Sequence, residues 1–296
     1  MQPPRELIET EVKTVLNRVT GMPFRWSINP YRGCAHACVF CYARRTHWFL
    51  EEDGVNEWAS KIFVKVNAPE VLRRELSRPS WRREEVALGT ATDPYQAIES
   101  RYRITRAVLE ALRDFRTPVG IVTRSPLILR DIDLLTAMAR LVNVRVCISV
   151  ATTDPGLARQ IEPTVASPAQ RLRAVQVLAS SGIRTGVLLA PILPGLTDGR
   201  DSLAGVIQAA RDAGAAFVGH GVLHLGEVTK DAFVRFLSQR YPGLVPLYRR
   251  LYPGRYAPPG YQRQVAQVVA AERARTHLRE PRYLRPPAAP RQLRLF

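Results

Sequence analysis

The sequence has little of what marks secreted and membrane proteins. Its 296 residues include only four cysteines, three of them in one short segment, so no disulfide framework is expected. The amino terminus has no basic stretch followed by an apolar one, as a secretory signal would have. No apolar run is long enough to span a bilayer. These absences argue against a disulfide-stapled or membrane-spanning protein and predict a protein of the reducing cytoplasm.

Acidic residues are also scarce. Lys and Arg number 43 against 26 Asp and Glu, which gives a formal net charge of +17. Nearly all the basic residues are arginine, whose planar guanidinium fits phosphate, so the surplus indicates polyanionic partners. Genome composition or heat adaptation that favours arginine is the alternative. From residue 249 onward eleven arginines stand against two glutamates. This end is a candidate nucleic-acid contact surface, with a solvated helix face as the alternative.

One short loop carries the strongest chemical signal. Cys34, Cys38 and Cys41 are separated by three and two residues, so three thiolates can be directed at one inorganic centre, as in iron-sulfur proteins. Three ligands leave one iron open, and an open position is typical of a reactive rather than a structural centre. The alternative is a zinc site with His36 or His47 as fourth ligand, although the sequence offers no second zinc-binding arm.

This spacing, with Phe40 before the third cysteine, resembles the signature of radical S-adenosylmethionine (SAM) enzymes. The flanking Asn29-Pro30-Tyr31-Arg32-Gly33 and Tyr42-Ala43-Arg44 are similar to the branch that contains spore photoproduct lyase, often called DNA repair photolyase-like. The resemblance implies a 4Fe-4S cluster on the three cysteines and an open iron that chelates SAM. It also implies reductive cleavage of SAM to a 5′-deoxyadenosyl radical, with an electron donor such as flavodoxin or ferredoxin.

Hydrophobic residues make up 46% of the chain and charged residues 23%, which is typical of a globular protein. Short β-branched runs alternate with amphipathic stretches, which predicts repeated βα units around a parallel sheet. Strands are expected at 26–29, 62–66, 86–91, 119–123, 144–150, 185–190 and 217–223. Helices are expected between them, including 104–115, 132–141, 168–180 and 202–213.

The family resemblance implies that these units form a partial (β/α)6-type radical SAM barrel over residues 25–241. Residues 1–24 are expected to be a mainly helical N-terminal extension. Residues 242–286 are expected to be a basic, helical C-terminal extension, and residues 287–296 a flexible tail. In parallel α/β barrels the reactive groups lie on loops at the carboxyl ends of the strands. The cysteine loop follows the first strand, so it lies where chemistry is expected.

Polar residues end several of the predicted strands. Asp93 can accept hydrogen bonds from the amine of SAM, with a helix-initiating Asp-Pro turn as the alternative. His220 and His224 share a face of the last predicted strand, and a substrate-facing role is a hypothesis for His224. By resemblance to the family, the cofactor-binding residues are Phe40, Thr92, Asp93, Thr123, Ser149, Arg171 and Pro191.

Two residues are candidates for the radical chemistry itself. Tyr42 follows the third cysteine, as a tyrosine does in spore photoproduct lyase. That enzyme also uses a cysteine hydrogen donor near the segment that corresponds to 86–93, where this sequence has no cysteine. Cys147 shares a strand face with Ser149 and is the candidate substitute, with plain core filling as the alternative. The same lyase activity is therefore in question.

The sequence ends in a short motif, Gln292-Leu293-Arg294-Leu295-Phe296. It resembles the peptide by which bacterial DNA repair and replication proteins dock on the polymerase sliding clamp. Gln292, Leu293, Leu295 and Phe296 are the candidate contacts, whereas Arg294 departs from the usual small or acidic residue. A chance match is the alternative for so short a motif.

These features together predict a radical SAM enzyme that acts on a nucleic-acid base lesion or a modified nucleotide, with DNA as the expected partner. A base in duplex DNA must be flipped out of the stack to reach such a site. Two alternatives stay open. One is a radical SAM enzyme that acts on RNA, a peptide or a small molecule, and the other is a non-enzymatic metal-cluster protein that binds nucleic acid.

Overall fold

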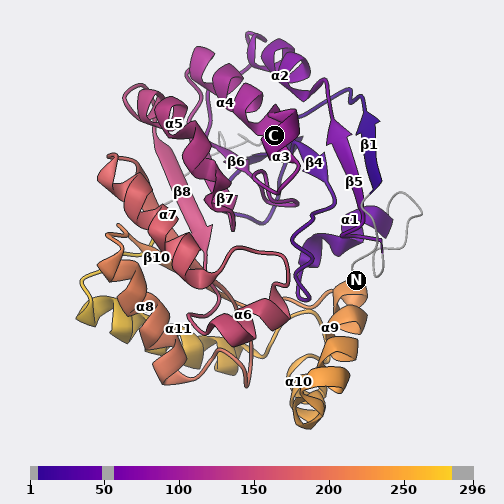
Figure 1. The fold of residues 1–296 in the computed structure, drawn as a ribbon, viewed down its shortest axis with the longest axis vertical. Coiled ribbons are helices and arrows are strands. Elements are labelled where there is room, and N and C mark those ends of the chain that lie inside the picture. Colours follow the sequence, from indigo (N-terminus) through magenta and orange to yellow (C-terminus); the bar gives the residue numbers. More distant parts are fainter. Residues whose placement is uncertain (1–5, 49–56, 282–296) are drawn as a thin grey trace, which may run out of the picture.

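A computed structural model describes residues 6–48 and 57–281 (Figure 1). The predicted clamp-binding motif at 292–296 lies outside the described residues, so that contact stays a prediction. In the described part of the chain, no helix combines the length and the apolar content that crossing a bilayer requires.

The main sheet has seven strands within the described residues. Its strands are β2 (Asn17–Arg18), β3 (Trp26–Ile28), β6 (Val86–Leu88), β7 (Val119–Thr123), β8 (Val144–Ser149), β9 (Arg184–Ile192) and β10 (Val218–Val222). Their order is β10-β9-β8-β7-β6-β3-β2. β3 and β6 to β10 run parallel, and β2 joins the edge antiparallel to β3. The six parallel strands agree with the predicted partial (β/α)6-type barrel.

Helices between the strands cover the outside of this sheet, as α4, α5, α7 and α8 do in Figure 1. The helices before β10 are α1 (Arg45–Trp48), α2 (Ala68–Leu76), α3 (Glu99–Tyr102), α4 (Ile104–Asp114), α5 (Ile132–Ala139), α6 (Pro155–Ile161), α7 (Pro168–Ser180) and α8 (Arg200–Asp212). The sequence explains their ends. At the start of α7, the Ser167 hydroxyl accepts from Gln170 N and the Gln170 side chain accepts from Ser167 N, a capping box. Gly182 follows its end at φ +77°, a conformation that favours glycine.

The two faces of the main sheet carry different side chains. Val146 and Ile148 of β8 are fully buried in the main hydrophobic core with residues of α4, α5 and α7. Alternate strand positions point to the other face, where Gly120 and Gly186 have no side chain. A Cβ on Gly186 would lie 2.4 Å from the Phe217 ring. At this level the barrel interior is therefore filled by the Phe217 ring, and glycine makes room for it.

The prediction of a helical N-terminal extension is wrong. β1 (Glu6–Thr10) pairs in parallel with β5 (Lys61–Lys65), and β4 (Tyr31–Arg32) pairs antiparallel with β5, which gives a separate three-stranded sheet in the described chain. In the segment after β1, the backbone N–H groups of Val15 and Leu16 donate to the Glu75 carboxylate of α2. The predicted strand at 62–66 therefore exists but lies outside the main sheet. Pairing with a distant segment overrides local propensity here.

The C-terminal extension is helical, as predicted, and returns to the barrel. After α9 (Glu227–Arg240), which lies in the predicted barrel range, the extension contains a short 3-10 helix η3 (Pro242–Leu244), α10 (Val245–Leu251) and α11 (Pro259–Arg275), with α11 packed on α8 and β10. Beyond α11, Arg279 forms a parallel bridge with Phe217, and Val218 N donates to Arg279 O at 3.0 Å. The extension thus covers the outer edge of β10.

Candidate active site

The cysteine loop lies between β4 and the 3-10 helix η1 (Tyr42–Arg44). Gly33 precedes it at φ +82°, and a Cβ there would lie 2.4 Å from Lys61 O, so only glycine fits. Inside the loop, Ala37 N donates to Cys34 O at 3.3 Å and Cys41 N to Cys38 O at 3.2 Å. Cys34 and Cys38 are buried and Cys41 is half-buried. The backbone therefore folds the three cysteines into one compact turn.

The three thiols share one electrostatic environment. Burial, with a smaller effect from neighbouring thiols, raises the pKa of Cys38 well above its usual range. Burial and then Cys34 raise the pKa of Cys41 to about 11. Arg124 and Arg44 act in the opposite direction on the pKa of Cys41. Among the described residues, no three His, Cys, Asp or Glu side chains are gathered closely enough to hold one metal ion. A cuboidal cluster instead spreads its thiolates over different irons.

The two histidines of the zinc alternative have other partners. His47 Nε2 lies 3.0 Å from Lys61 O, and its ring packs edge-on against Trp58 and Phe63. His36 lies beside Cys34, and its Nδ1 pairs with Asp93 Oδ2 at 3.3 Å. Burial alone would lower the pKa of His36, but Asp93 and Cys34 raise it to about 10. His47 therefore interacts with β5 of the three-stranded sheet, and His36 interacts with Asp93.

Asp93 is buried, and both of its carboxylate oxygens already interact with other groups of the protein. Its Oδ1 accepts from Thr123 Oγ1 at 2.6 Å and from Tyr95 N at 2.9 Å. Its Oδ2 accepts from Arg124 N at 2.7 Å and pairs with His36. Burial raises the pKa of Asp93, but His36 and these donors lower it overall. Asp93 therefore ties the ends of β6 and β7 to the cysteine loop, and its predicted contact with the amine of SAM stays a prediction.

Thr92 and Gln96 fasten the loop from the same segment. Thr92 Oγ1 donates to Gly33 O at 2.6 Å, and Ala35 N donates to Gln96 Oε1 at 2.8 Å. Gln96 Nε2 also donates to Thr92 Oγ1 at 3.1 Å. Both side chains are buried. Thr92 was predicted as a cofactor contact, whereas Gln96 was missed because a glutamine inside a turn carries no chemical signature.

A buried chain of charge runs beneath the loop. Arg124, at the carboxyl end of β7, donates through Nε to Glu162 Oε1 at 2.8 Å, and Arg171 Nη2 pairs with Glu162 Oε2 at 2.7 Å. Arg171 Nη1 donates to Ser149 O at 2.8 Å. The Arg171 side chain is only 1% exposed and that of Arg124 is 21% exposed. Arg171 therefore connects β8 to Glu162 at the end of α6. Of these two arginines, Arg124 has the side chain that is partly accessible to solvent.

Two of the remaining predicted cofactor residues lie near Arg124. The Arg124 guanidinium carbon lies 5.5 Å from the centre of the buried Phe40 ring. Arg124 Nη2 donates at 3.3 Å to the carbonyl of Ala190, next to the half-buried Pro191. Ser149 is buried at the end of β8, and within the described residues its hydroxyl has no hydrogen-bond partner. The sequence prediction missed Arg124, and the Ser149 backbone is linked to it through Arg171 and Glu162.

An open pocket of about 360 Å³ lies beside Tyr42, between η1 and the start of α9. The Tyr42 ring is 49% exposed, and its hydroxyl donates to Thr90 O. Burial, more than the neighbouring Cys41, raises the pKa of Tyr42 to about 12. His224 lines the same pocket with its ring 6.4 Å from that of Tyr42. The pocket is lined by Tyr42, Arg45, His224, Gly226, Glu227, Val228, Thr229 and Arg255.

His220 lies elsewhere. It belongs to β10, and its pKa is lowered by burial and by Arg273, with Glu280 opposing, so it faces the C-terminal extension. The strand is irregular between His220 and Val222, which breaks the alternation that would place His220 and His224 on one face. The structure thus separates the two histidines, and only His224 lies beside Tyr42.

Cys147 lies inside the barrel in contact with Arg145, which pairs with Glu85. Burial raises the pKa of Cys147 to about 11. Cys147 is the fourth residue of β8 and lies level with Val122 on β7, one position before the strand end at Thr123. The hydrogen-donor role stays a prediction.

Replacing Cys147 by alanine is expected to leave the iron content and SAM cleavage of the protein unchanged, because Cys147 is far from the loop in sequence and pairs with Arg145. Iron and sulfide analysis after anaerobic reconstitution would check this. A variant that lost its iron would contradict the assignment of the cluster to the other three cysteines.

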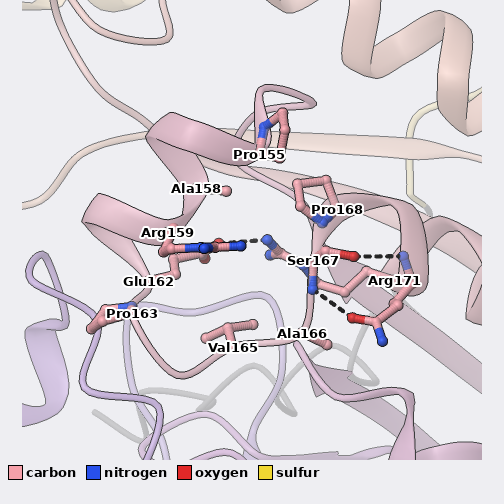
Figure 2. A pocket seen from close by; sticks show the side chains of 11 residues that line it. Pro155, Ala158, Arg159, Glu162, Pro163, Val165, Ala166, Ser167, Pro168 and Arg171 are labelled. Carbon is pink, nitrogen blue, oxygen red and sulfur yellow. Dashed lines mark hydrogen bonds and ion pairs between the residues drawn. The ribbon is translucent and has the colours of Figure 1, made fainter.

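A second pocket, of about 230 Å³, lies between α6 and α7. Figure 2 shows the ion pair of Glu162 and Arg171 that spans it from α6 to α7, beside the capping box of Ser167. Glu162 and the β8 backbone bind Nη2 and Nη1 of Arg171, and within the described residues its buried Nε has no hydrogen-bond partner.

The chain is similar to a known protein family and to proteins of other organisms. A family model described as the radical SAM superfamily matches residues 28–207. An uncharacterized protein of Mycobacterium tuberculosis is 41% identical over 88% of this chain and 78% of its own length. An uncharacterized protein of Methanocaldococcus jannaschii is 29% identical over 65% of this chain and 70% of its own length.

Solved structures give the same fold. Mutants of spore photoproduct lyase superpose with a TM-score of 0.66 at 16% identity, covering 91% of this chain and 79% of theirs. One of these was solved with bound AdoMet and dinucleoside spore photoproduct. At this identity the likeness shows a shared fold.

Proposed function

Because the chain belongs to the radical SAM superfamily, whose members use a 4Fe-4S cluster and SAM, we propose that this radical SAM enzyme acts on a base lesion or modified nucleotide in DNA. The observation that carries the proposal is the fold, which follows spore photoproduct lyase over 91% of the chain, and that lyase was solved with a dinucleoside photoproduct. The net charge of +17 supports an anionic substrate.

The cysteine loop fits a 4Fe-4S cluster. Cys34, Cys38 and Cys41 offer three thiols from one compact turn, and Arg44 and Arg124 lie close enough to influence them. Arg44 Nη2 also donates to Cys38 O at 3.1 Å, which fixes the turn from outside. Cationic groups around such a site offset the negative charge of thiolates and tune the metal centre. These three cysteines would therefore hold the cluster and leave one iron for SAM.

The groups at the strand ends fit SAM. A buried hydroxyl without a partner costs stability, so the Ser149 hydroxyl suits a bound group that hydrogen-bonds to it. Arg124 offers a partly exposed guanidinium, which pairs well with a carboxylate. Phe40 and Pro191 supply apolar surface on either side. We assign Asp93, Thr92, Thr123 and Arg171 a positioning role, because their hydrogen bonds are made to other parts of the protein.

When bound and reduced, the cluster and SAM supply a 5′-deoxyadenosyl radical that removes a hydrogen atom from the substrate. The protein must hold both groups rigidly and keep water away from them. Asp93 and Gln96 fix the cysteine loop to β6, and Glu162 fixes Arg124 to α6. Tyr42 bridges the loop and Thr90 on the open side, beside the pocket where substrate would enter.

The reaction itself departs from that of the lyase. The segment 86–93 has no cysteine, and Cys147 lies in contact with Arg145 inside the barrel. In this proposal Tyr42 would return a hydrogen atom to the product and would itself be restored by a hydrogen atom from 5′-deoxyadenosine, with Cys147 as the alternative donor.

The test is substrate-stimulated SAM cleavage by the anaerobically reconstituted, reduced protein. Ultraviolet-damaged oligonucleotides are expected to raise 5′-deoxyadenosine formation by about tenfold over undamaged DNA, with a change in the chromatographic retention of the oligonucleotide. RNA, peptides and small molecules serve as matched competitors.

Stimulation by a peptide or small molecule alone would overturn the substrate class and leave the radical SAM activity standing. A reduced, cluster-loaded sample that produced no 5′-deoxyadenosine with any of these substrates would count against the enzyme itself.

A further inference from the structure

We propose that Tyr42, His224 and Tyr256 form a stacking surface for an unpaired nucleobase, with Arg45 and Arg255 placed for its backbone phosphates. We name this set the aromatic pocket. The inference rests on the proposed function and adds to it the residues that bind the nucleotide beside the cysteine loop.

The His224 ring lies next to both tyrosine rings. The centre of the His224 ring lies 6.4 Å from that of Tyr42 and 4.7 Å from that of Tyr256. A backbone bridge between His224 and Tyr256 holds the segment after α10 against the end of β10. Leu225 N also donates to Arg255 O at 2.9 Å. The C-terminal extension is thus fixed in the position that lines up the rings.

The rings face solvent instead of packing into a core. Tyr42 is 49% exposed and Tyr256 is 67% exposed, and both are among the few large hydrophobic side chains that are exposed in the described chain. Among the described residues, the two tyrosine rings contact the half-buried histidine ring, and much of the surface of each tyrosine is open to solvent. Bases stack on such exposed rings regardless of their sequence, which is how single-stranded nucleic acid is commonly bound.

The charge around the rings suits phosphate. Arg45 and Arg255 line the pocket, and both are exposed. Burial lowers the pKa of His224, and Arg255 and Arg45 lower it further, so both guanidiniums act on this ring. Glu227 also lines the pocket, and its carboxylate can accept from the N–H edge of a base. Aromatic faces flanked by two arginines favour a nucleotide over an apolar peptide or a lipid.

The position links this surface to the chemistry. Tyr42 follows the third cysteine directly, and Thr229, also in the pocket, donates to Cys41 O at 3.1 Å. A pocket of about 360 Å³ has room for a base, since small-molecule pockets begin at about 300 Å³. A base held there would lie beside the cysteine loop.

Fluorescence anisotropy of the reconstituted full-length protein with labelled oligothymidylate tests the pocket. Tyr256→Ala is expected to weaken binding about tenfold, the order of one lost base stack. Arg255→Gln is expected to make the salt dependence shallower by about one charge. Tyr102→Ala on α3 and Arg74→Gln on α2 are the matched controls, which should bind like the parent, because both lie outside the pocket and outside the arginine-rich C-terminal end. An oligouridylate arm distinguishes DNA from RNA as the source of the base.

Two results would overturn the inference. If both pocket variants bound as the parent does, while damaged DNA still stimulated SAM cleavage, the stacking surface would be wrong and the proposed function would stand. If the parent bound neither oligonucleotide better than a peptide of similar charge, the pocket assignment and the nucleic-acid substrate would both fall.

Discussion

Replacing Cys38 by alanine is expected to abolish SAM cleavage, because the cluster would lose one of the three thiolates that hold it. Cys34→Ala and Cys41→Ala should have the same effect. Iron and sulfide content, visible absorption and 5′-deoxyadenosine formation would be measured on the same anaerobic sample. The expected result is loss of the cluster absorption and 5′-deoxyadenosine at background level.

The matched control is Cys147→Ala, which removes the same thiol from the barrel interior. A clear separation between the loop variants and this control would assign the metal to the loop. Full iron content in the Cys38 variant, or zinc in place of iron in the parent, would contradict the assignment.

Replacing Glu162 by alanine is expected to lower the free energy of unfolding by about 3–5 kcal/mol, the cost of removing one partner from a buried ion pair. The Glu162 side chain is 1% exposed and is shared by Arg124 and Arg171. Without it, two guanidiniums are left without their carboxylate. Urea unfolding monitored by circular dichroism would measure the loss, and SAM affinity should fall with it because Arg124 would no longer be held.

Glu110→Ala on α4 is the matched control, because its 3.3 Å ion pair with Arg106 is solvent-exposed. Exposed pairs contribute about 0–1 kcal/mol. Equal losses in the two variants would show that the Glu162 pair is no stronger than a surface pair.

The contribution of Glu162 should also depend on pH. Burial raises the pKa of Glu162, but Arg171 and Arg124 lower it overall below its ordinary value of 4.5. A carboxyl whose pKa is lowered by folding stabilises the protein fully above its unfolded pKa and loses that effect as the pH falls through the folded pKa. The difference in unfolding free energy between the parent and Glu162→Gln should therefore be constant near neutral pH and shrink below pH 4.5.

Features encoded by neighbouring residues were predicted well from the sequence. Three cysteines within one loop revealed the site, and the hydrophobic patterns of α4 and α7 gave their positions to within two residues. In both cases the signal and the structure involve the same short segment, so no distant partner is needed to interpret it.

Features that depend on distant partners were missed. Glu162 meets Arg124 across 38 residues, and nothing local distinguishes it from a surface glutamate. Tyr256 reaches His224 only because the C-terminal extension folds back, and β1 finds β5 across the cysteine loop. Asp93 was predicted as a cofactor contact, and that role stays a prediction; its four protein partners come from three separate segments that the sequence does not place together.

The bridge between Arg279 and Phe217 covers part of the edge of the main sheet next to β10. An open parallel sheet ends in a row of unpaired backbone groups, and such a row can recruit a strand from another molecule. Arg279 occupies part of that row, beside Phe217 and Val218. A fragment that stopped at the end of α11 would uncover it, and self-association through this edge is the outcome to watch for when the chain is shortened.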